Sequence, residues 1–188
     1  MNPIGPLILT ASDVRWPHTV ERRLNVAAPS RLWAVGDTEI LSLRKVGLFC
    51  SERCPDEAAL AARKALQRLD ADSRVVVSGF QSPVEKDCLR ILLEAGRPAI
   101  VCPARSLQKV RLPDDWLRAL EAGRLLLLSR FEKTRRADKE TARRRNELVA
   151  ALSDEILIIH AEPGGQVERI SALAERWRVP RLELGSAR

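Results

Sequence analysis

The stretch SRVVVSGFQSPVEKDCLRILLEAGRPAIVC, residues 73–102, decides the fold class. Its β-branched run at 73–80 predicts a buried strand that ends at a glycine. Residues 83–96 have apolar residues at helical spacing, with a proline at the start and a glycine at the stop. Residues 97–102 predict the next strand. A strand, a helix and a strand in this order indicate two parallel strands joined by a right-handed crossover.

The same alternation continues on both sides of this unit. Further strands are expected at 45–50, 124–129, 155–160 and 179–184, and further helices at 56–69, 114–122, 137–152 and 164–177. Because the strands are almost continuously apolar, both faces of the sheet should be covered. The sequence therefore predicts an α/β fold of Rossmann-like type, with a doubly wound, mostly parallel sheet and helices on both faces.

Residues 1–43 differ in composition from the rest of the chain. They hold four of the eleven prolines and one predicted strand at 32–37. We expect residues 1–43 to be an extension packed on the core, and residues 44–188 to form the Rossmann-like domain.

Hydropathy and cysteine content indicate a cytoplasmic protein. No apolar run approaches the ~20 residues of a membrane-spanning helix, and the first twenty residues lack the pattern of a secretory signal. The four cysteines Cys50, Cys54, Cys88 and Cys102 are then expected to be free thiols in a reducing compartment. The spacing of Cys50 and Cys54 has no second close pair to complete a zinc site, so no metal or cofactor is expected.

Positive charge is concentrated in one segment of the chain. The 188 residues carry a net charge of +7, and residues 130–145 hold eight basic and three acidic residues, which leaves +5 there and +2 elsewhere. Such a segment is typical of a patch for an acidic ligand. It is equally typical of a solvated helix face with ion pairs between successive turns.

Ligands of doubly wound sheets bind outside the carboxyl ends of the strands. The loops expected at this edge are 51–55, 79–83, 103–113, 130–136 and 161–165.

The loop 79–83 precedes a helix whose free amide groups favour an anion. Gly79 would let the backbone approach a ligand, with Gln81 and Ser82 beside it. The ring of Phe80 could stack on a base or plug the top of the helix. Lys86, in the first helical turn, indicates either a negative ligand nearby or a solvated lysine.

Two further positions at this edge have open interpretations. Gly164 and Gly165 precede a helix, which allows a phosphate to approach the backbone but also makes an ordinary turn. Phe131 is a second possible stacking ring. Motifs of hydrolases and nucleotide-binding loops are missing from the sequence, so catalysis is not expected.

Arg145 lies in line with the apolar stripe of its helix, together with Leu148 and Leu152. A buried unpaired guanidinium is costly, so this side chain should reach the sheet edge and bind phosphate, or pair with a carboxylate. Asp154 and Glu85 are conceivable partners.

A family resemblance adds to this reading. Residues 145–154, RNELVAALSD, resemble the R-N-R-I-I-A-G-L-S-D signature of the DNA-processing protein DprA/Smf family. LWAVGD at 32–37 is similar to the family's L-Y-x-x-G-(N/D) segment, and VGLFCS at 46–51 to its A-I-V-G-S-R segment. The resemblance runs in order from about residue 32 to the end of the chain.

The resemblance implies a Rossmann-like protein that binds single-stranded DNA in a basic pocket at the strand ends. It also implies a homodimer that helps to load a recombinase during DNA uptake. Ser51, Gly79, Arg145 and Asn146 would line the pocket, and Arg53 would replace the arginine that the family has one position earlier. The candidate nucleic-acid-binding residues are Ser51, Arg53, Gly79, Phe80, Gln81, Ser82, Lys86, Arg145, Asn146, Gly164 and Gly165.

Two other functions stay open. One is a nucleotide-binding sensor or a phosphoribohydrolase-like enzyme of the same superfamily. Residues 163–165 resemble the start of the P-G-G-x-G-T motif of such enzymes. Val167 and Glu168, however, stand where the next glycine and the threonine of that motif should be. The other is an interaction protein whose arginine-rich helix binds an acidic partner.

Overall fold

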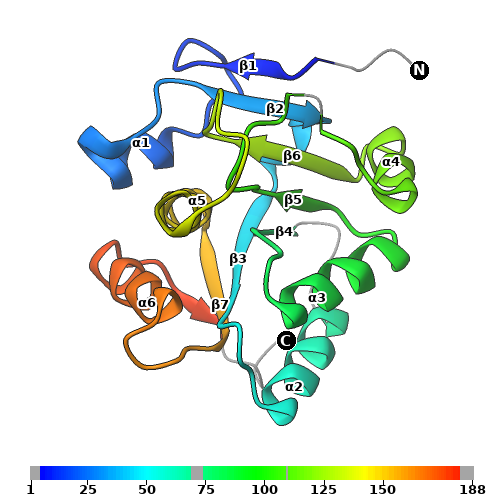
Figure 1. Cartoon of the computed structure of the whole chain (residues 1–188), viewed down its shortest axis with the longest axis vertical. Coiled ribbons are helices and arrows are strands. Elements are labelled where there is room, and N and C mark those ends of the chain that lie inside the picture. Colours follow the sequence, from blue (N-terminus) through cyan, green and yellow to red (C-terminus); the bar gives the residue numbers. More distant parts are fainter. Residues whose placement is uncertain (1–4, 69–73, 109, 183–188) are drawn as a thin grey trace.

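The computed structural model describes residues 5–68, 74–108 and 110–182, and these residues form one sheet between two layers of helices (Figure 1). The strands lie in the order β1-β2-β6-β5-β4-β3-β7-β8. Their bounds are β1 Leu7–Leu9, β2 Leu32–Gly36, β3 Arg44–Cys50, β4 Arg74–Ser78, β5 Ala99–Val101, β6 Leu125–Ser129, β7 Glu155–His160 and β8 Arg181–Leu182. Residues 69, 73, 183 and 184 of the predicted elements lie outside the described part.

Strands β3 to β8 all run parallel, which confirms the predicted doubly wound sheet. The chain winds outward from β3 in two directions, to β4, β5 and β6 on one side and to β7 and β8 on the other. The strand order therefore reverses between β3 and β7, and all the parallel strands end at one edge.

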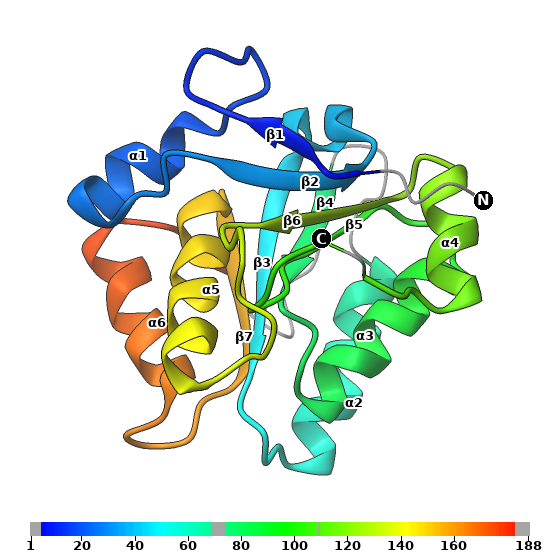
Figure 2. The same ribbon diagram turned by 45° about the horizontal axis from the view of Figure 1, so that its top comes forward.

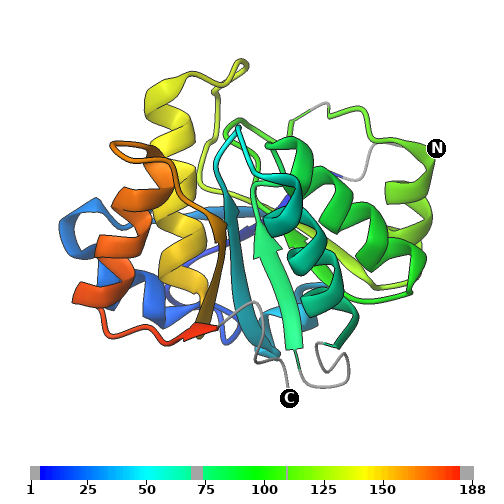
Figure 3. The ribbon, with the colours of Figure 1, turned by 90° about the horizontal axis from the view of Figure 1, so that it is seen from below.

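Helices cover the two faces in groups of three (Figures 2 and 3). Helices α2 (Asp56–Arg68), α3 (Pro83–Glu94) and α4 (Asp114–Glu121) bury one apolar cluster against the sheet. Helices α1 (His18–Leu24), α5 (Lys139–Leu152) and α6 (Gln166–Arg176) bury the other. Of the helices described, none combines the length and the apolar character that crossing a membrane would take.

The segment before residue 44 joins the sheet through two strands. Strand β2 pairs antiparallel with β6, and β1 pairs antiparallel with β2. Trp16 and Val20 are buried in the same apolar cluster as α5 and α6. The division of the chain at residue 43 stays a prediction.

Polar side chains define where the helices beside the strand ends begin. The Ser82 hydroxyl accepts the Glu85 amide N–H at 3.3 Å, and the Glu85 carboxylate accepts the Ser82 N–H at 3.3 Å. Asp138 and Thr141 form the same reciprocal pair at the start of α5. Each pair satisfies amides that a helix leaves without internal partners, so α3 and α5 begin at fixed positions at the carboxyl edge.

Candidate functional site

Ser51 joins two loops at the point where the strand order reverses. Its backbone N–H donates to the His160 carbonyl at 3.0 Å, and its hydroxyl accepts the Glu162 N–H at 2.9 Å. The side chain is buried, so it holds the loops after β3 and β7 together.

Gly79 and Arg145 come together from β4 and α5. A Cβ atom at Gly79 would lie 1.3 Å from Nη1 of Arg145, so only glycine leaves room for the guanidinium. Arg145 is 5% exposed, and its Nη1 donates to the Cys102 carbonyl at 3.5 Å. Within the described part of the chain, its Nε has no acceptor. Burial lowers the pKa of Arg145, and the charge of Glu85 opposes this shift.

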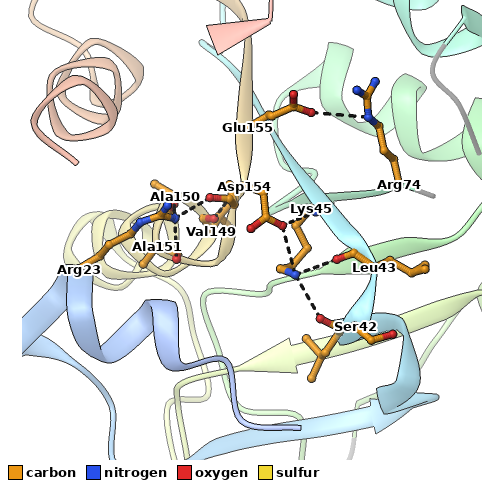
Figure 4. Close-up of polar contacts among 12 residues, drawn as sticks. Arg23, Ser42, Leu43, Lys45, Arg74, Val149, Ala150, Ala151, Asp154 and Glu155 are labelled. Atoms are coloured by element: carbon orange, nitrogen blue, oxygen red, sulfur yellow. Dashed lines mark hydrogen bonds and ion pairs between the residues drawn. The ribbon is translucent and has the colours of Figure 1, made fainter. Parts of the chain in front are cut away.

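Asp154 is not the partner of Arg145. It lies before β7, at the amino ends of the strands, where it accepts the Lys45 N–H at 2.7 Å and pairs with Lys45 Nζ at 3.3 Å (Figure 4). Of the two conceivable carboxylate partners of Arg145, Asp154 is therefore excluded. Arg23 lies near the same edge and donates to the Ala151 carbonyl at 3.0 Å (Figure 4). It also donates to the Ser153 carbonyl at 2.5 Å.

Glu85 organises the loop after β4, a role that the sequence reading did not assign to it. Its buried carboxylate accepts the backbone N–H groups of Cys50 at 3.0 Å and Gln81 at 2.8 Å, besides that of Ser82. Burial raises the pKa of the Glu85 carboxyl, and these hydrogen bonds and the charge of Arg145 oppose the rise. Among the residues described, Glu85 and Arg145 do not form an ion pair within 4.0 Å, so they interact over a longer distance. The Ser82-x-x-Glu85 spacing was the signal for this role.

Four amide groups in the two loops expected to receive an anion already have partners. Glu85 takes those of Gln81 and Ser82 at the start of α3. The Gly164 N–H donates to Glu168 Oε2 at 2.7 Å, and the Gly165 N–H donates to the Glu162 carbonyl at 3.0 Å. These four amides are therefore not free for a phosphate. Helix α6 begins without a side-chain cap, so phosphate binding at the loop 164–165 stays a prediction.

Both candidate stacking rings are buried. Phe80 is 3% exposed and packs into the cluster under α2 and α3, with a positive φ of 49° that turns its side chain inward. Phe131 is 6% exposed, and the Arg144 guanidinium lies 5.9 Å from its ring centroid. The expectation that Phe80 or Phe131 offers a ring to a base is wrong, and for Phe80 the plug interpretation is correct.

The remaining candidates differ in exposure. Arg53, Gln81 and Lys86 are exposed, and Asn146 is partly exposed. Gln81 Nε2 donates to the Gly79 carbonyl at 3.1 Å, which holds the loop backbone in place.

A basic hollow opens between the loops after β5 and β6, two of the loops expected at the ligand edge. It has a volume of about 920 Å³. Among the residues that the structure describes, its lining includes four cations and no carboxylate: Arg105, Arg111, Lys133 and Arg135. We call this set the basic hollow. Ser106 joins its two walls, because its N–H donates to the Thr134 carbonyl at 2.8 Å and its hydroxyl to the Glu132 carbonyl at 2.7 Å.

The basic residues of the segment 130–145 thus lie in several different environments. Lys133 and Arg135 face the basic hollow, and Arg145 is buried beside Gly79. Arg143 pairs with Glu140 at 2.5 Å and also with Glu147, as the solvated helix face predicted. The sequence reading missed Arg105 and Arg111, whose only signal was their position in the loop 103–113.

The four cysteines differ in their exposure. Cys50, Cys88 and Cys102 are buried and Cys54 is partly exposed, and all four are free thiols. Burial raises the pKa of the Cys88 and Cys102 thiols to about 12. In the described ranges, no group of three or more histidine, cysteine or acidic side chains is arranged to hold a metal ion.

The family model for DNA recombination-mediator protein A matches residues 7–173, which is most of the chain. The chain belongs to the DNA recombination-mediator protein A family. This confirms the resemblance stated from the sequence. No curated protein matches the chain.

Two solved structures of the family have the same fold. DNA processing protein A from Streptococcus pneumoniae superposes with a TM-score of 0.74 at 21% identity, over 90% of this chain and 60% of that protein. DNA processing protein A from Helicobacter pylori, whose structure is described in terms of its single-stranded DNA binding mode, superposes with a TM-score of 0.75 at 24% identity. That match covers 93% of this chain and 79% of the Helicobacter protein. The chain therefore spans about 60% of the length of the pneumococcal protein.

Proposed function

We propose that this protein binds single-stranded DNA without catalysis and acts in DNA processing, uptake and recombination. The observation that carries the proposal is the basic hollow at the carboxyl edge of the sheet, whose described lining has four cations and no carboxylate. Guanidinium and ammonium groups without acidic neighbours suit the phosphates of a nucleic-acid strand. Membership of the DNA recombination-mediator protein A family supports the same function.

The burial of both candidate phenylalanine rings favours recognition of the phosphates of the strand over recognition of its bases. Because Phe80 and Phe131 are both in the core, neither provides a stacking platform for bases. Binding should then rest on phosphate contacts and be insensitive to base sequence. Arg53, Lys86 and Asn146 extend the proposed path along the edge toward Gly79, where Arg145 stiffens the loop from below.

The test is a titration of a labelled single-stranded oligonucleotide, followed by fluorescence anisotropy at several salt concentrations. If all four cations of the basic hollow contact phosphates, log affinity should fall against log salt with a slope of about −2.8, at ~0.7 for each contact to a single strand. The double variant K133A/R135A should make that slope shallower by about 1.4. Arg118→Ala, in the last turn of α4 and outside the hollow, is the matched control and should leave the slope unchanged.

Two results would overturn the proposal. One is a failure of the wild-type protein to bind single-stranded oligonucleotides at low salt. The other is a salt slope that is the same in the wild type and in K133A/R135A. A parallel titration with a duplex of the same sequence measures the preference for single strands.

The proposal includes a homodimer, contact with a recombinase and a cytoplasmic location, which follow from the family resemblance and, for the location, from the free cysteines. Light scattering after gel filtration tests the dimer. Strand-exchange activity of a recombinase on DNA coated with a single-strand-binding protein, with and without this chain, tests the recombinase contact.

A further inference from the structure

A second group of arginines lies on the helical face of α1, α5 and α6, away from the basic hollow. Helices α1 and α6 both pack against α5 (Figure 2). A hollow of about 240 Å³ lies among them, and its lining includes five arginines and one carboxylate: Arg23, Arg130, Arg143, Arg144, Arg176 and Glu147. We call this the arginine pocket; it shares no lining residue with the basic hollow.

Arg130 is the buried cation of the arginine pocket. It is 8% exposed, its Nη2 donates to the Ala27 carbonyl at 2.7 Å, and its Nη1 donates to the Arg144 carbonyl at 3.3 Å. In the part of the chain that the structure describes, its Nε is buried without an acceptor. Carbonyl groups orient a guanidinium but do not neutralise it, and a buried cation without a counter-ion is unfavourable.

The local field makes this position still more unfavourable for a cation. Burial and, to a smaller extent, the neighbouring charge of Arg144 lower the pKa of Arg130 to about 10, while the charge of Glu147 opposes the shift. A negative ligand between these guanidinium groups would reverse both effects.

The carboxylate of the pocket is already engaged. Glu147 pairs with Arg143, which also pairs with Glu140 at 2.5 Å. Arg23 is engaged as well, because it donates to carbonyls at the end of α5. Arg130, Arg144 and Arg176 have no ion-pair partner among the residues described.

We propose that the arginine pocket binds a phosphate group through Arg130, Arg144 and Arg176. A phosphate carries several acceptor oxygens in a compact group, so it can receive hydrogen bonds from three guanidinium groups at once. A hollow of about 240 Å³ is smaller than the usual sites of whole small-molecule ligands, and this favours a phosphate group over a complete nucleotide. The phosphate belongs either to free inorganic phosphate or to a nucleic-acid strand that reaches this face. The proposal does not rest on DNA binding at the basic hollow.

The first experiment measures thermal unfolding in sodium phosphate and in sodium chloride of equal ionic strength. The wild-type Tm should rise with phosphate concentration beyond its value in chloride, because a ligand of the folded state stabilises it. Arg176→Ala, an exposed change that should not disturb folding, should weaken phosphate binding about tenfold or more, since it removes one charged hydrogen-bonding partner. Arg118→Ala is the matched control and should respond to phosphate like the wild type.

A second variant tests the buried cation of the arginine pocket instead of an exposed one. Arg130→Met replaces the buried cation by an apolar side chain of similar length. In chloride its Tm should stay close to that of the wild type, because the removal of an unpaired buried charge offsets the loss of its hydrogen bonds to the Ala27 and Arg144 carbonyls. In phosphate its Tm should show no further rise.

A titration of the same variants with a single-stranded oligonucleotide identifies the source of the phosphate. If the group belongs to a bound strand, Arg176→Ala should lower the affinity and make the salt slope shallower by about 0.7. If it is free phosphate, Arg176→Ala should bind the oligonucleotide like the wild type and lose only the Tm response. The proposal is overturned if phosphate raises the wild-type Tm no more than chloride does and Arg176→Ala leaves oligonucleotide binding unchanged. A wild-type protein that responds to phosphate but binds no oligonucleotide would refute the proposed function and support the phosphate site.

Discussion

Replacing Gly79 by alanine should destabilise the protein only while Arg145 is present. The new Cβ atom would lie 1.3 Å from Nη1 and 2.1 Å from Cζ of Arg145, so the buried guanidinium has to move. The backbone of Gly79 is outside the left-handed region, so alanine adds no backbone strain of its own. The whole effect should then come from one steric conflict.

The size of this effect follows from two opposing contributions. Forcing extra volume into a packed site costs about 1–3 kcal/mol. Replacing glycine by alanine at a compatible backbone position contributes about 0.4–1 kcal/mol in the other direction, because the unfolded chain loses freedom. Gly79→Ala should therefore lower the free energy of unfolding by up to about 2.6 kcal/mol in the wild type. In the Arg145→Ala background the same change should be neutral or stabilising, which makes the coupling between the two sites about 1–3 kcal/mol.

The assay is a double-mutant cycle by urea unfolding, followed by the fluorescence of the four tryptophans. Gly5→Ala is the control, since a Cβ atom there meets nothing within 4 Å, and it should change the stability by no more than about 0.5 kcal/mol. Equal costs of Gly79→Ala with and without Arg145 would refute the proposed contact between them.

The other predictions concern the thiols and the helix ends. Cys54 should react first with an alkylating reagent at pH 8, while Cys88 and Cys102 stay protected until the chain unfolds. Mass spectrometry of partly labelled protein checks this order, and early labelling of Cys88 would contradict it. Burial raises the folded pKa of these two thiols from 9.0 to about 12, so stability should fall as the pH rises from 9 to 12, by up to about 1.4 kcal/mol per pH unit for each thiol. Replacing both by alanine should make the profile less steep, and the remaining slope should include Cys50, whose pKa burial also raises. Ser82→Ala should destabilise the protein by about 1 kcal/mol through the loss of the α3 cap, and an unchanged urea midpoint would show that the cap is dispensable. Arg23→Ala should lower the stability by about 1–2 kcal/mol, because it leaves carbonyls at the end of α5 without their charged donor; unaltered hydrogen exchange at that end would be the contrary result.

Local sequence was sufficient for the helices and strands after residue 44, but it predicted neither β1 nor α1, and it was not sufficient for the loops at the ligand edge. The helix expected at 83–96 spans Pro83–Glu94, because its cap and its terminal glycine are local signals. The loop before it could not be interpreted in the same way. The inward turn of Phe80 depends on a positive φ and on the apolar cluster below it, neither of which is visible in neighbouring residues.

Two carboxylates explain why amides predicted to be free for phosphate have partners. Glu85 and Glu168 accept hydrogen bonds from amides that the sequence left open for phosphate. The start of a helix attracts any nearby anion, and a carboxylate of the same chain is always close by. The basic hollow was missed as a unit because Arg105 and Arg135 are distant in the chain and meet only when β5 and β6 pair.

The sequence by itself determined the parallel α/β architecture, the family and the edge at which a ligand should bind, because apolar periodicity and strand direction depend on residues close together in the chain. The tertiary structure alone decided which charges are available at that edge. It buried Arg145 beside Gly79, paired Asp154 with Lys45 at the opposite edge, and left Arg111 and Lys133 facing an open hollow. The exposure of a charged group and the sign of its neighbours are set by contacts between distant segments, and no local pattern in the sequence contains them.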